Sequence, residues 1–201
     1  MTFAYFTSCC AAVFALLVLT KALNQWRQSG RFPIYFGKTG TLKERFEEVF
    51  AVSGLFATLV CMTLSPWLGL TGLFFDSISF LNSVAIGLLG GVLASLSILV
   101  LAKAYVDMGE SWRLGIDRET ADKLVTTGIF AKSRNPICIA INLLLVGYFL
   151  ANPNLFFLIL AVVGLLGTHT QILNEERFLA AHYGEEFASF AARTGRYWTF
   201  N

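Results

Sequence analysis

The chain has 201 residues, of which 56% are hydrophobic and only 14% are charged, whereas soluble domains are usually about a quarter charged. This composition, with a mean hydropathy of +0.64, excludes an ordinary soluble domain and predicts an all-α integral membrane protein. The formal net charge of +2 is too small to indicate a nucleic-acid partner.

Five segments are apolar enough to cross a bilayer as helices, which takes about 20 residues, or somewhat fewer where helices pair tightly. They cover residues 2–23, 46–65, 82–104, 136–151 and 154–173. The last two segments are joined by ANPN at 151–154, which leaves room only for a tight turn, so we predict a helical hairpin over 136–173. Residues 66–81 contain a proline and two glycines that disfavour a helix, and we predict an interfacial turn there rather than a sixth crossing.

The charges support this count of crossings. All fifteen Lys and Arg lie in the blocks 21–45, 103–134 and 177–196. Five crossings place these blocks on one side, as the positive-inside rule requires. We therefore predict a multi-pass protein of the cell inner membrane with its N-terminus outside and its C-terminus in the cytoplasm. The first basic residue is Lys21, so we interpret the first segment as a retained helix rather than a cleaved signal.

The apolar segments carry residues that predict helix packing rather than chemistry. Gly87, Gly91 and Ser95 follow a four-residue spacing, which lets two membrane helices approach closely. The four cysteines form no CxxC pair, and the chain has only two histidines, His169 and His182. We therefore predict neither a disulfide framework nor a metal site. No charged residue falls mid-membrane, which disfavours an ion-coupled transporter.

A cation, an amide and a proline stand directly before the fourth apolar segment, namely Arg134, Asn135 and Pro136. Proline fits the first turn of a helix, where its missing N–H costs no hydrogen bond, so we predict that a helix begins at Pro136. A cation opposes the positive end of the helix dipole, but together with unpaired N–H groups it makes an anion site. Arg134 therefore either holds a carboxylate or phosphate at the membrane surface or extends toward lipid phosphates.

A second polar stretch, residues 171–198, follows the hairpin. Read as one helix, its large apolar side chains share a stripe, and Glu176 lies near the middle of that stripe. An acid on an inward face needs a cation or donor; alternatively, Glu175 and Glu176 mark a helix start, where the dipole favours acids. Because the hairpin is short, we expect Arg134 at the depth of these acids, where the three charges could hold a zwitterionic ligand.

Two stretches carry a resemblance to a known family. LVTTGIFAKSRNPICIA at 124–140 and EERFLAAHYGEEF at 175–187, separated by an apolar hairpin, resemble the isoprenylcysteine carboxyl methyltransferase and phospholipid methyltransferase superfamily. The resemblance covers about residues 105–198 and is to the bacterial members; residues 1–104 match only as hydrophobic helices. We expect three N-terminal crossings in 1–104 and a cofactor-binding methyltransferase region in 105–201.

The resemblance implies a membrane-embedded methyltransferase that uses S-adenosylmethionine. The cofactor is expected in a cytoplasm-facing pocket capped by the C-terminal helix, with a lipophilic acceptor entering between helices. Position by position, the resemblance assigns cofactor binding to Asp122, Lys123, Leu124, Val125, Phe130, Asn135, Pro136, Ile137, Cys138 and Glu175. We expect Arg134 to orient a carboxylate of the cofactor or acceptor, Glu176 to hold the constellation or accept a proton, and Gln171 to lie near the acceptor.

Departures from the family pattern leave the acceptor open. Asn135 replaces a histidine, Cys138 a tyrosine and Ala140 a glycine, while Gln171 aligns with an arginine of the members that act on prenylcysteine carboxylates. The acceptor is accordingly a prenylcysteine-like carboxylate, a lipid amine or a small hydrophobic metabolite.

Two other functions remain as alternatives. One is an NADPH-dependent membrane reductase, because integral sterol reductases have a similar architecture. The other is a non-catalytic membrane relative, a hypothesis motivated by Cys138 and Ala140, which replace the tyrosine and glycine of the family.

Overall fold

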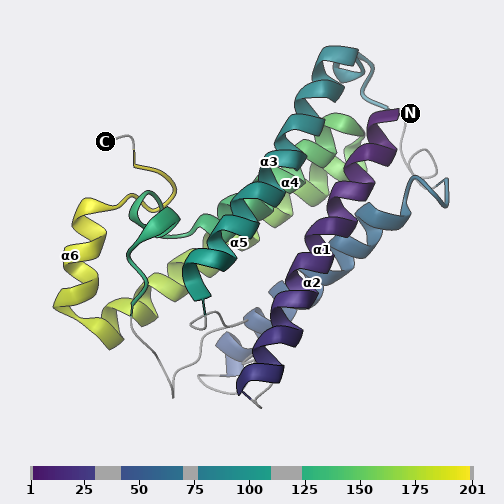
Figure 1. Ribbon diagram of the computed structural model, residues 1–201. Coiled ribbons are helices and arrows are strands. Elements are labelled where there is room, and N and C mark those ends of the chain that lie inside the picture. The colour runs from purple at the N-terminus through teal and green to yellow at the C-terminus, as the bar shows by residue number, and fades with distance from the viewer. Residues whose placement is uncertain (1, 30–41, 70–76, 110–123, 200–201) are drawn as a thin grey trace.

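The computed structural model describes residues 2–29, 42–69, 77–109 and 124–199. Its elements are α1 (Thr2–Ser29), α2 (Leu42–Leu64), η2 (Ser79–Leu81), α3 (Val84–Met108), η4 (Gly128–Ala131), α4 (Pro136–Ala151), α5 (Leu155–Tyr183) and α6 (Glu185–Arg193) (Figure 1). The two η elements are single 3₁₀ turns. Within these ranges the only β-type pairing is an isolated bridge between Ser77 and Asn154, so the predicted all-α fold is confirmed.

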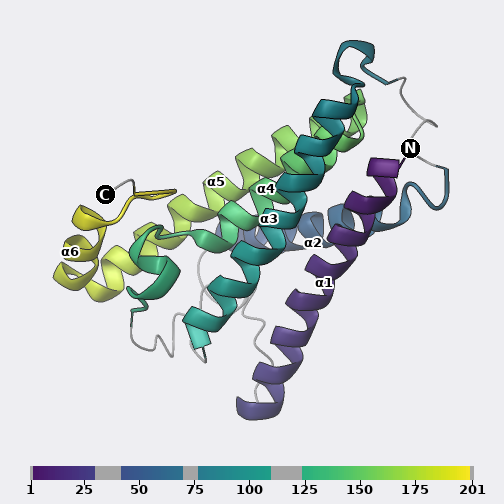
Figure 2. The ribbon, with the colours of Figure 1, turned by 45° about the horizontal axis from the view of Figure 1, so that its top comes forward.

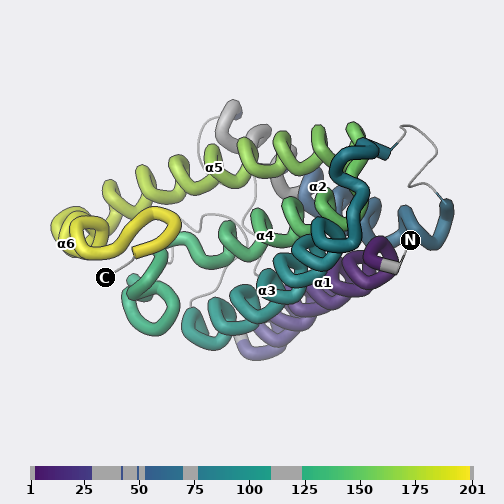
Figure 3. Tube along the Cα trace, turned by 90° about the horizontal axis from the view of Figure 1, so that it is seen from above, coloured from purple at the N-terminus to yellow at the C-terminus, as the bar shows by residue number. Residues whose placement is uncertain are grey.

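The long helices form one elongated bundle. Figure 3 shows four of them side by side in the order α1, α3, α4 and α5, and α2 packs against α1 and α5. The start of α1 lies at one end of the molecule and α6 at the other (Figures 1 and 2). The beginning of α4, the end of α5 and the chain after α6 therefore meet at one end of the bundle.

Three of the described helices, α1, α3 and α5, are long and apolar enough to cross a membrane. The apolar part of α2 (Ser53–Leu64) and the whole of α4 (Pro136–Ala151) are shorter. A helix the length of α4 rises about 24 Å, less than the roughly 30 Å of a bilayer core. The chain is therefore a membrane protein, while five crossings and the orientation of the termini remain predictions.

The small residues of α3 are contact points, as their spacing predicts. A Cβ built on Gly87 would lie 2.5 Å from the ring of Phe3, and one on Gly91 would lie 3.4 Å from the ring of Phe6, so this stripe faces α1. A third glycine, Gly90, faces α4 instead, where a Cβ would lie 2.5 Å from the backbone oxygen of Gly147. Close approach on two sides of α3 positions α4 in the middle of the bundle.

Residues 66–81, predicted to form an interfacial turn, lie partly outside the described residues. The part after the gap returns to the turn between α4 and α5, where Ile78 N donates to Pro153 O at 2.7 Å. The Asn154 side chain at that turn accepts from Phe157 N and caps α5. This turn defines the end of the bundle opposite α6.

The polar stretch after the hairpin is not one helix. α5 continues without a break to Tyr183, and Gly184, with φ of 52°, ends it and begins the separate helix α6. Only a glycine adopts such a backbone conformation readily. The predicted single helix over 171–198 is therefore wrong, and so is the alternative that Glu175 and Glu176 mark a helix start, because both lie well inside α5.

Candidate active site

The approach to α4 is fixed by local hydrogen bonds. Pro136 occupies the first position of the helix, as predicted, and Asn135 is its N-cap. Asn135 N donates to Oγ of Ser133, which is fully buried, at 3.0 Å. These contacts set the direction in which the side chain of Arg134 leaves the backbone.

The turn before this segment is held by α3. Oδ2 of Asp107, near the end of α3, accepts from Ile129 N at 2.6 Å, which satisfies an N–H at the start of η4. Gly128 has φ of 62°, and a Cβ built on it would collide with the Asp107 carboxylate. Glycine is thus required here both by the backbone conformation and by the space.

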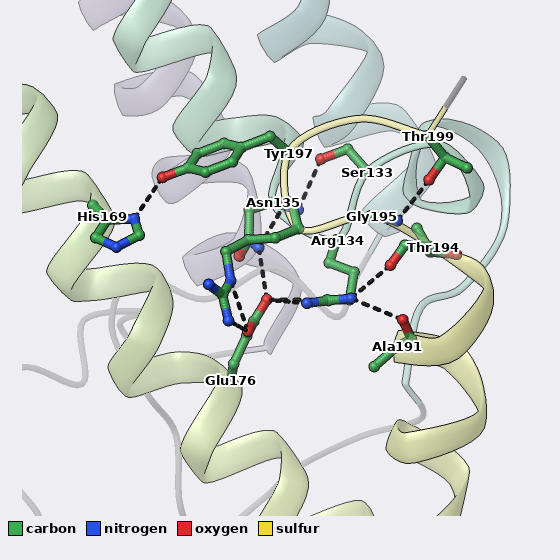
Figure 4. A network of polar contacts seen from close by, with 11 residues as sticks. Ser133, Arg134, Asn135, His169, Glu176, Ala191, Thr194, Gly195, Tyr197 and Thr199 are labelled. Carbon is green, nitrogen blue, oxygen red and sulfur yellow. Dashed lines mark hydrogen bonds and ion pairs between the residues drawn. The ribbon is translucent and has the colours of Figure 1, made fainter. Parts of the chain in front are cut away.

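Arg134 and Glu176 form an ion pair at the end of the bundle (Figure 4). Nη2 and Nε of Arg134 lie 2.8 and 3.0 Å from Oε1 of Glu176. The second oxygen of Glu176, Oε2, accepts from Nη2 and Nε of Arg196 at 2.7 and 3.0 Å. The hydrogen bond to Glu176 raises the pKa of Arg196, which keeps its guanidinium charged. Glu176 is therefore neutralised by two guanidinium groups.

This pair confirms that the hairpin brings Arg134 to the depth of Glu176 on α5. The Arg134 side chain is only 12% exposed, and its Nη1 donates to the backbone oxygens of Ala191 and Thr194 at 3.0 and 2.6 Å. Its donors thus bind protein groups, and the alternative in which it extends toward lipid phosphates is wrong. Arg134 connects the start of α4 to α5 and to the end of α6.

Residues 194–199, here called the C-terminal segment, lie across the start of α4 (Figure 4). Arg134 N donates to Gly195 O at 3.0 Å and Thr199 N to Lys132 O at 2.8 Å, while Nδ2 of Asn135 donates to Arg196 O at 3.1 Å. The Tyr197 hydroxyl and Nδ1 of His169 lie 2.7 Å apart. Main-chain and side-chain contacts together attach this segment to both α4 and α5.

Glu175 differs from its neighbour in its surroundings. Successive helix residues project about 100° apart, so Glu175 leaves α5 in a different direction from Glu176, and it acts electrostatically on the Cys138 thiol of α4. Its carboxylate makes no hydrogen bond or ion pair with any residue that the structure describes. One acid of the pair is therefore doubly neutralised, and the other has no cationic partner in the described part of the chain.

The remaining predicted site residues are spread along the approach to α4 and along α5. Leu124 and Val125 are half-buried in an irregular stretch before η4, and Phe130 is 5% exposed within η4. Ile137 packs against the hydrophobic core, whereas Cys138 and Gln171 are half-buried, Gln171 one turn before Glu175 on α5. The predictions for Asp122 and Lys123 lie outside the described residues.

Three contributors to this end of the bundle were not predicted. In the sequence, Arg196 is only the last cation of a basic block, although it supplies one of the two guanidinium groups on Glu176. Asp107 and the pair formed by His169 and Tyr197 carried no local signal, because their partners are distant in sequence. Among the described residues there is no group of three or more side chains that could hold a metal ion.

The family model described as phospholipid methyltransferase matches residues 85–186, which is half of the chain. The chain belongs to the phospholipid methyltransferase family. The match confirms the resemblance and extends it through α3, most of which was predicted only as a hydrophobic helix. It ends in the first turn of α6, so Arg196 and the whole C-terminal segment lie beyond it. A search among curated proteins finds no match.

Membership of this family makes the chain a membrane methyltransferase. The cluster around Glu176 lies at the junction of four parts of the chain, namely α4, α5, α6 and the C-terminal segment. Among the described residues, Arg134 and Arg196 both pair with Glu176, whereas the neighbouring Glu175 has no cationic partner.

Proposed function

We propose that this phospholipid methyltransferase family member transfers a methyl group from S-adenosylmethionine to a lipophilic acceptor at the cytoplasmic surface of the membrane. The observation that supports the proposal most is the carboxylate of Glu175, which has no partner among the described residues. A half-buried carboxylate is costly unless it meets a cation. The ammonium group of S-adenosylmethionine supplies such a cation, and its sulfonium supplies a second positive charge nearby.

Glu175 is assigned to the cofactor ammonium. The approach to α4 and its first turn, with Leu124, Val125, Asn135 and Cys138, would line the same site, and Asp122, Lys123, Phe130, Pro136 and Ile137 complete the proposed cofactor-binding set. Of the two roles expected of Glu176, holding the constellation fits its pairing with two arginines better than accepting a proton. Arg134 would orient a ligand carboxylate only by exchanging one of its carbonyl partners.

The chemistry asked of the protein is alignment. Bound S-adenosylmethionine supplies a methyl group on a positively charged leaving group, so the reaction needs no strong base when the acceptor is already nucleophilic. Holding donor and acceptor in line in a site that excludes water accounts for a large share of such a rate enhancement. Gln171, one turn from Glu175, is proposed to lie on the acceptor side.

Calorimetric titration of the purified protein in lipid nanodiscs tests this proposal. Wild type should bind S-adenosylmethionine and its demethylated product. Glu175→Gln should weaken binding about tenfold to 100-fold, the range expected for losing a charged hydrogen bond. Glu186→Gln is the matched control, because Glu186 is an exposed acid on α6 with the same chemistry, and it should bind like wild type.

Absence of cofactor binding by the wild type would remove the methyltransferase mechanism. Unchanged affinity in Glu175→Gln would remove the assignment of that residue, and loss of methyl transfer with retained binding would leave a non-catalytic relative. Titration with NADPH covers the reductase alternative, which no contact in the described residues favours.

A further inference from the structure

A polar pair joins α4 and α5 away from the ionic cluster. Oγ1 of Thr168 donates to Oδ1 of Asn142 at 2.7 Å and also lies 3.0 Å from the backbone oxygen of Leu165. Both side chains are half-buried. Asn142 lies in the second turn of α4, which is otherwise almost wholly apolar, and a polar side chain inside a membrane segment is a candidate functional residue.

The pair lies on the same faces as Glu175. Gly164 and Leu145 mark where α5 approaches α4, since a Cβ on Gly164 would lie 2.5 Å from Leu145 Cδ1. Thr168 and Glu175 are seven residues apart on α5, so they share that face and differ in height by about 10 Å. On α4, Cys138 and Asn142 are four residues apart and share one face in the same way. The Asn142–Thr168 pair therefore lies directly deeper in the bundle than Glu175 and Cys138.

The Nδ2 group of the Asn142 side chain has no hydrogen-bond partner among the described residues. A carboxamide has one acceptor oxygen and two N–H donors. Thr168 uses the oxygen, and Nδ2 makes no hydrogen bond to any residue that the structure describes. Unpaired donors are costly at membrane depth, where no water replaces the missing partner. A hydrogen-bond acceptor is therefore expected beside Nδ2 in the working protein.

We propose that Asn142 is a specificity-determining residue for the methyl acceptor: its Nδ2 donates a hydrogen bond to an anionic oxygen of the lipophilic substrate. Thr168 is a positioning residue that fixes the carboxamide with its N–H groups turned to the substrate. The inference rests on the proposed function, because it needs the cofactor ammonium at Glu175.

The dimensions agree with this assignment. From the ammonium nitrogen to the transferred methyl carbon there are five bonds of about 1.5 Å, an extended reach of about 6 Å. The reacting atoms approach to about 3–3.5 Å, which places the acceptor atom about 9 Å from the ammonium nitrogen. The ammonium–carboxylate contact adds about 3 Å, so the acceptor atom lies up to about 12 Å from the Glu175 carboxylate when the cofactor extends along the helix. Thr168 lies about 10 Å from Glu175 by the helical rise of α5. Asn142 is hydrogen-bonded to Thr168, so both side chains lie near the position expected for the acceptor.

Two kinds of substrate carry the required oxygen. In a lipophilic carboxylate, one oxygen forms the new C–O bond and the other accepts from Asn142. In a phospholipid amine, the nitrogen lone pair forms the new C–N bond, its proton leaves to water, and a phosphate oxygen accepts from Asn142. In both cases the C–S bond breaks with its electron pair going to sulfur, and Asn142 neither gives nor takes a proton.

The test follows labelled methyl from S-adenosylmethionine into a lipid extract of the host's own membranes, supplied at increasing concentration to nanodisc-embedded protein. Asn142→Leu should raise the half-saturating extract concentration about tenfold or more and leave cofactor affinity within twofold of wild type. Asn142→Asp, which keeps an oxygen but loses the donors, should fail in the same way. Thr168→Val should show a smaller increase, and Thr168→Ser should restore wild-type behaviour.

The outcomes separate the two proposals. Wild type that binds no cofactor or transfers no label overturns the proposed function and this inference together. Two outcomes overturn the inference alone when the wild type transfers the label. One is a half-saturating extract concentration in Asn142→Leu equal to that of the wild type, and the other is full activity in Asn142→Asp. If Asn142→Leu does not fold, the comparison of Thr168→Val with Thr168→Ser decides. Release of the label by mild base identifies a methyl ester and hence a carboxylate substrate, whereas base-stable label identifies the amine.

Discussion

Glu176→Gln should release the C-terminal segment from the bundle. The change replaces the carboxylate that two guanidinium groups share by a neutral amide, and it leaves the Arg134 side chain, only 12% exposed, without its counter-ion. Removing one partner of a buried ion pair costs about 3–5 kcal/mol. The contact with Arg196 adds less than about 1 kcal/mol, because that side chain is 38% exposed.

We take about 3 kcal/mol, because Arg134 keeps its two carbonyl partners and the low end of the range then applies. At about 1.4 kcal/mol per factor of ten, the open form of the C-terminal segment should become about 100-fold more populated. Trypsin reports this directly, since cleavage after Arg196 requires that its side chain leave Glu176 and its carbonyl leave Asn135. When opening and closing are fast, the cleavage rate follows the population of the open form.

The assay is the rate at which intact mass shows loss of residues 197–201 in nanodiscs. Glu186→Gln, which alters an exposed acid on α6, should be cut at the wild-type rate. Equal cleavage rates in Glu176→Gln and wild type would refute the reasoning, because the shared carboxylate would then contribute nothing to holding the segment.

Two further predictions concern glycines, with thermal unfolding as the measurement. Gly128 has φ of 62°, and Gly128→Ala adds a Cβ that collides with the Asp107 side chain, so it should lower the unfolding temperature. Gly69→Ala is the control, because φ there is 68° but nothing lies within 4 Å, and its effect should be smaller. Equal shifts in the two variants would show that η4 can move away from the added Cβ at little cost. Gly90→Ala places a Cβ 2.5 Å from the backbone of α4, so it should lower the free energy of unfolding by about 1–3 kcal/mol and the unfolding temperature by several degrees. Gly54→Ala is the control, because nothing lies within 4 Å of its Cβ, and it should be neutral or stabilising. A stable Gly90→Ala would mean that α3 and α4 separate without loss.

Where hydrophobicity alone decides the structure, the sequence was sufficient. The fourth apolar segment, predicted at 136–151, has those bounds in α4, because a proline starts it and a tight turn ends it. The fifth, predicted to end at 173, continues as α5 to Tyr183. Hydropathy marks where a chain can leave lipid, but backbone hydrogen bonds continue a helix into water until a residue such as Gly184 ends it. That glycine, followed by two acids, was a usable signal for the start of α6.

The site was predictable to the extent that it depends on the hairpin. A short turn returns the chain to the same end of the bundle, and this alone places Arg134 beside Glu176. Sequence could not show that Arg196 comes back to the second oxygen of the same carboxylate, because that contact depends on how residues after α6 fold over α4. Nor could it show that Thr168 faces Asn142, since pairing across two helices depends on their rotation and offset.

The unequal treatment of two adjacent acids explains how one cluster can both hold the fold and leave a charge for a ligand. A cation of the chain paired with Glu175 would have to be displaced before a ligand ammonium could bind, and separating a buried pair costs about 3–5 kcal/mol. In the described residues both nearby guanidinium groups are instead directed to Glu176. Folding then bears the cost of a half-buried carboxylate at Glu175, and a bound cation relieves it. The proposed site is thus expected to be more stable when occupied, because a ligand that binds only the folded protein stabilises it by mass action.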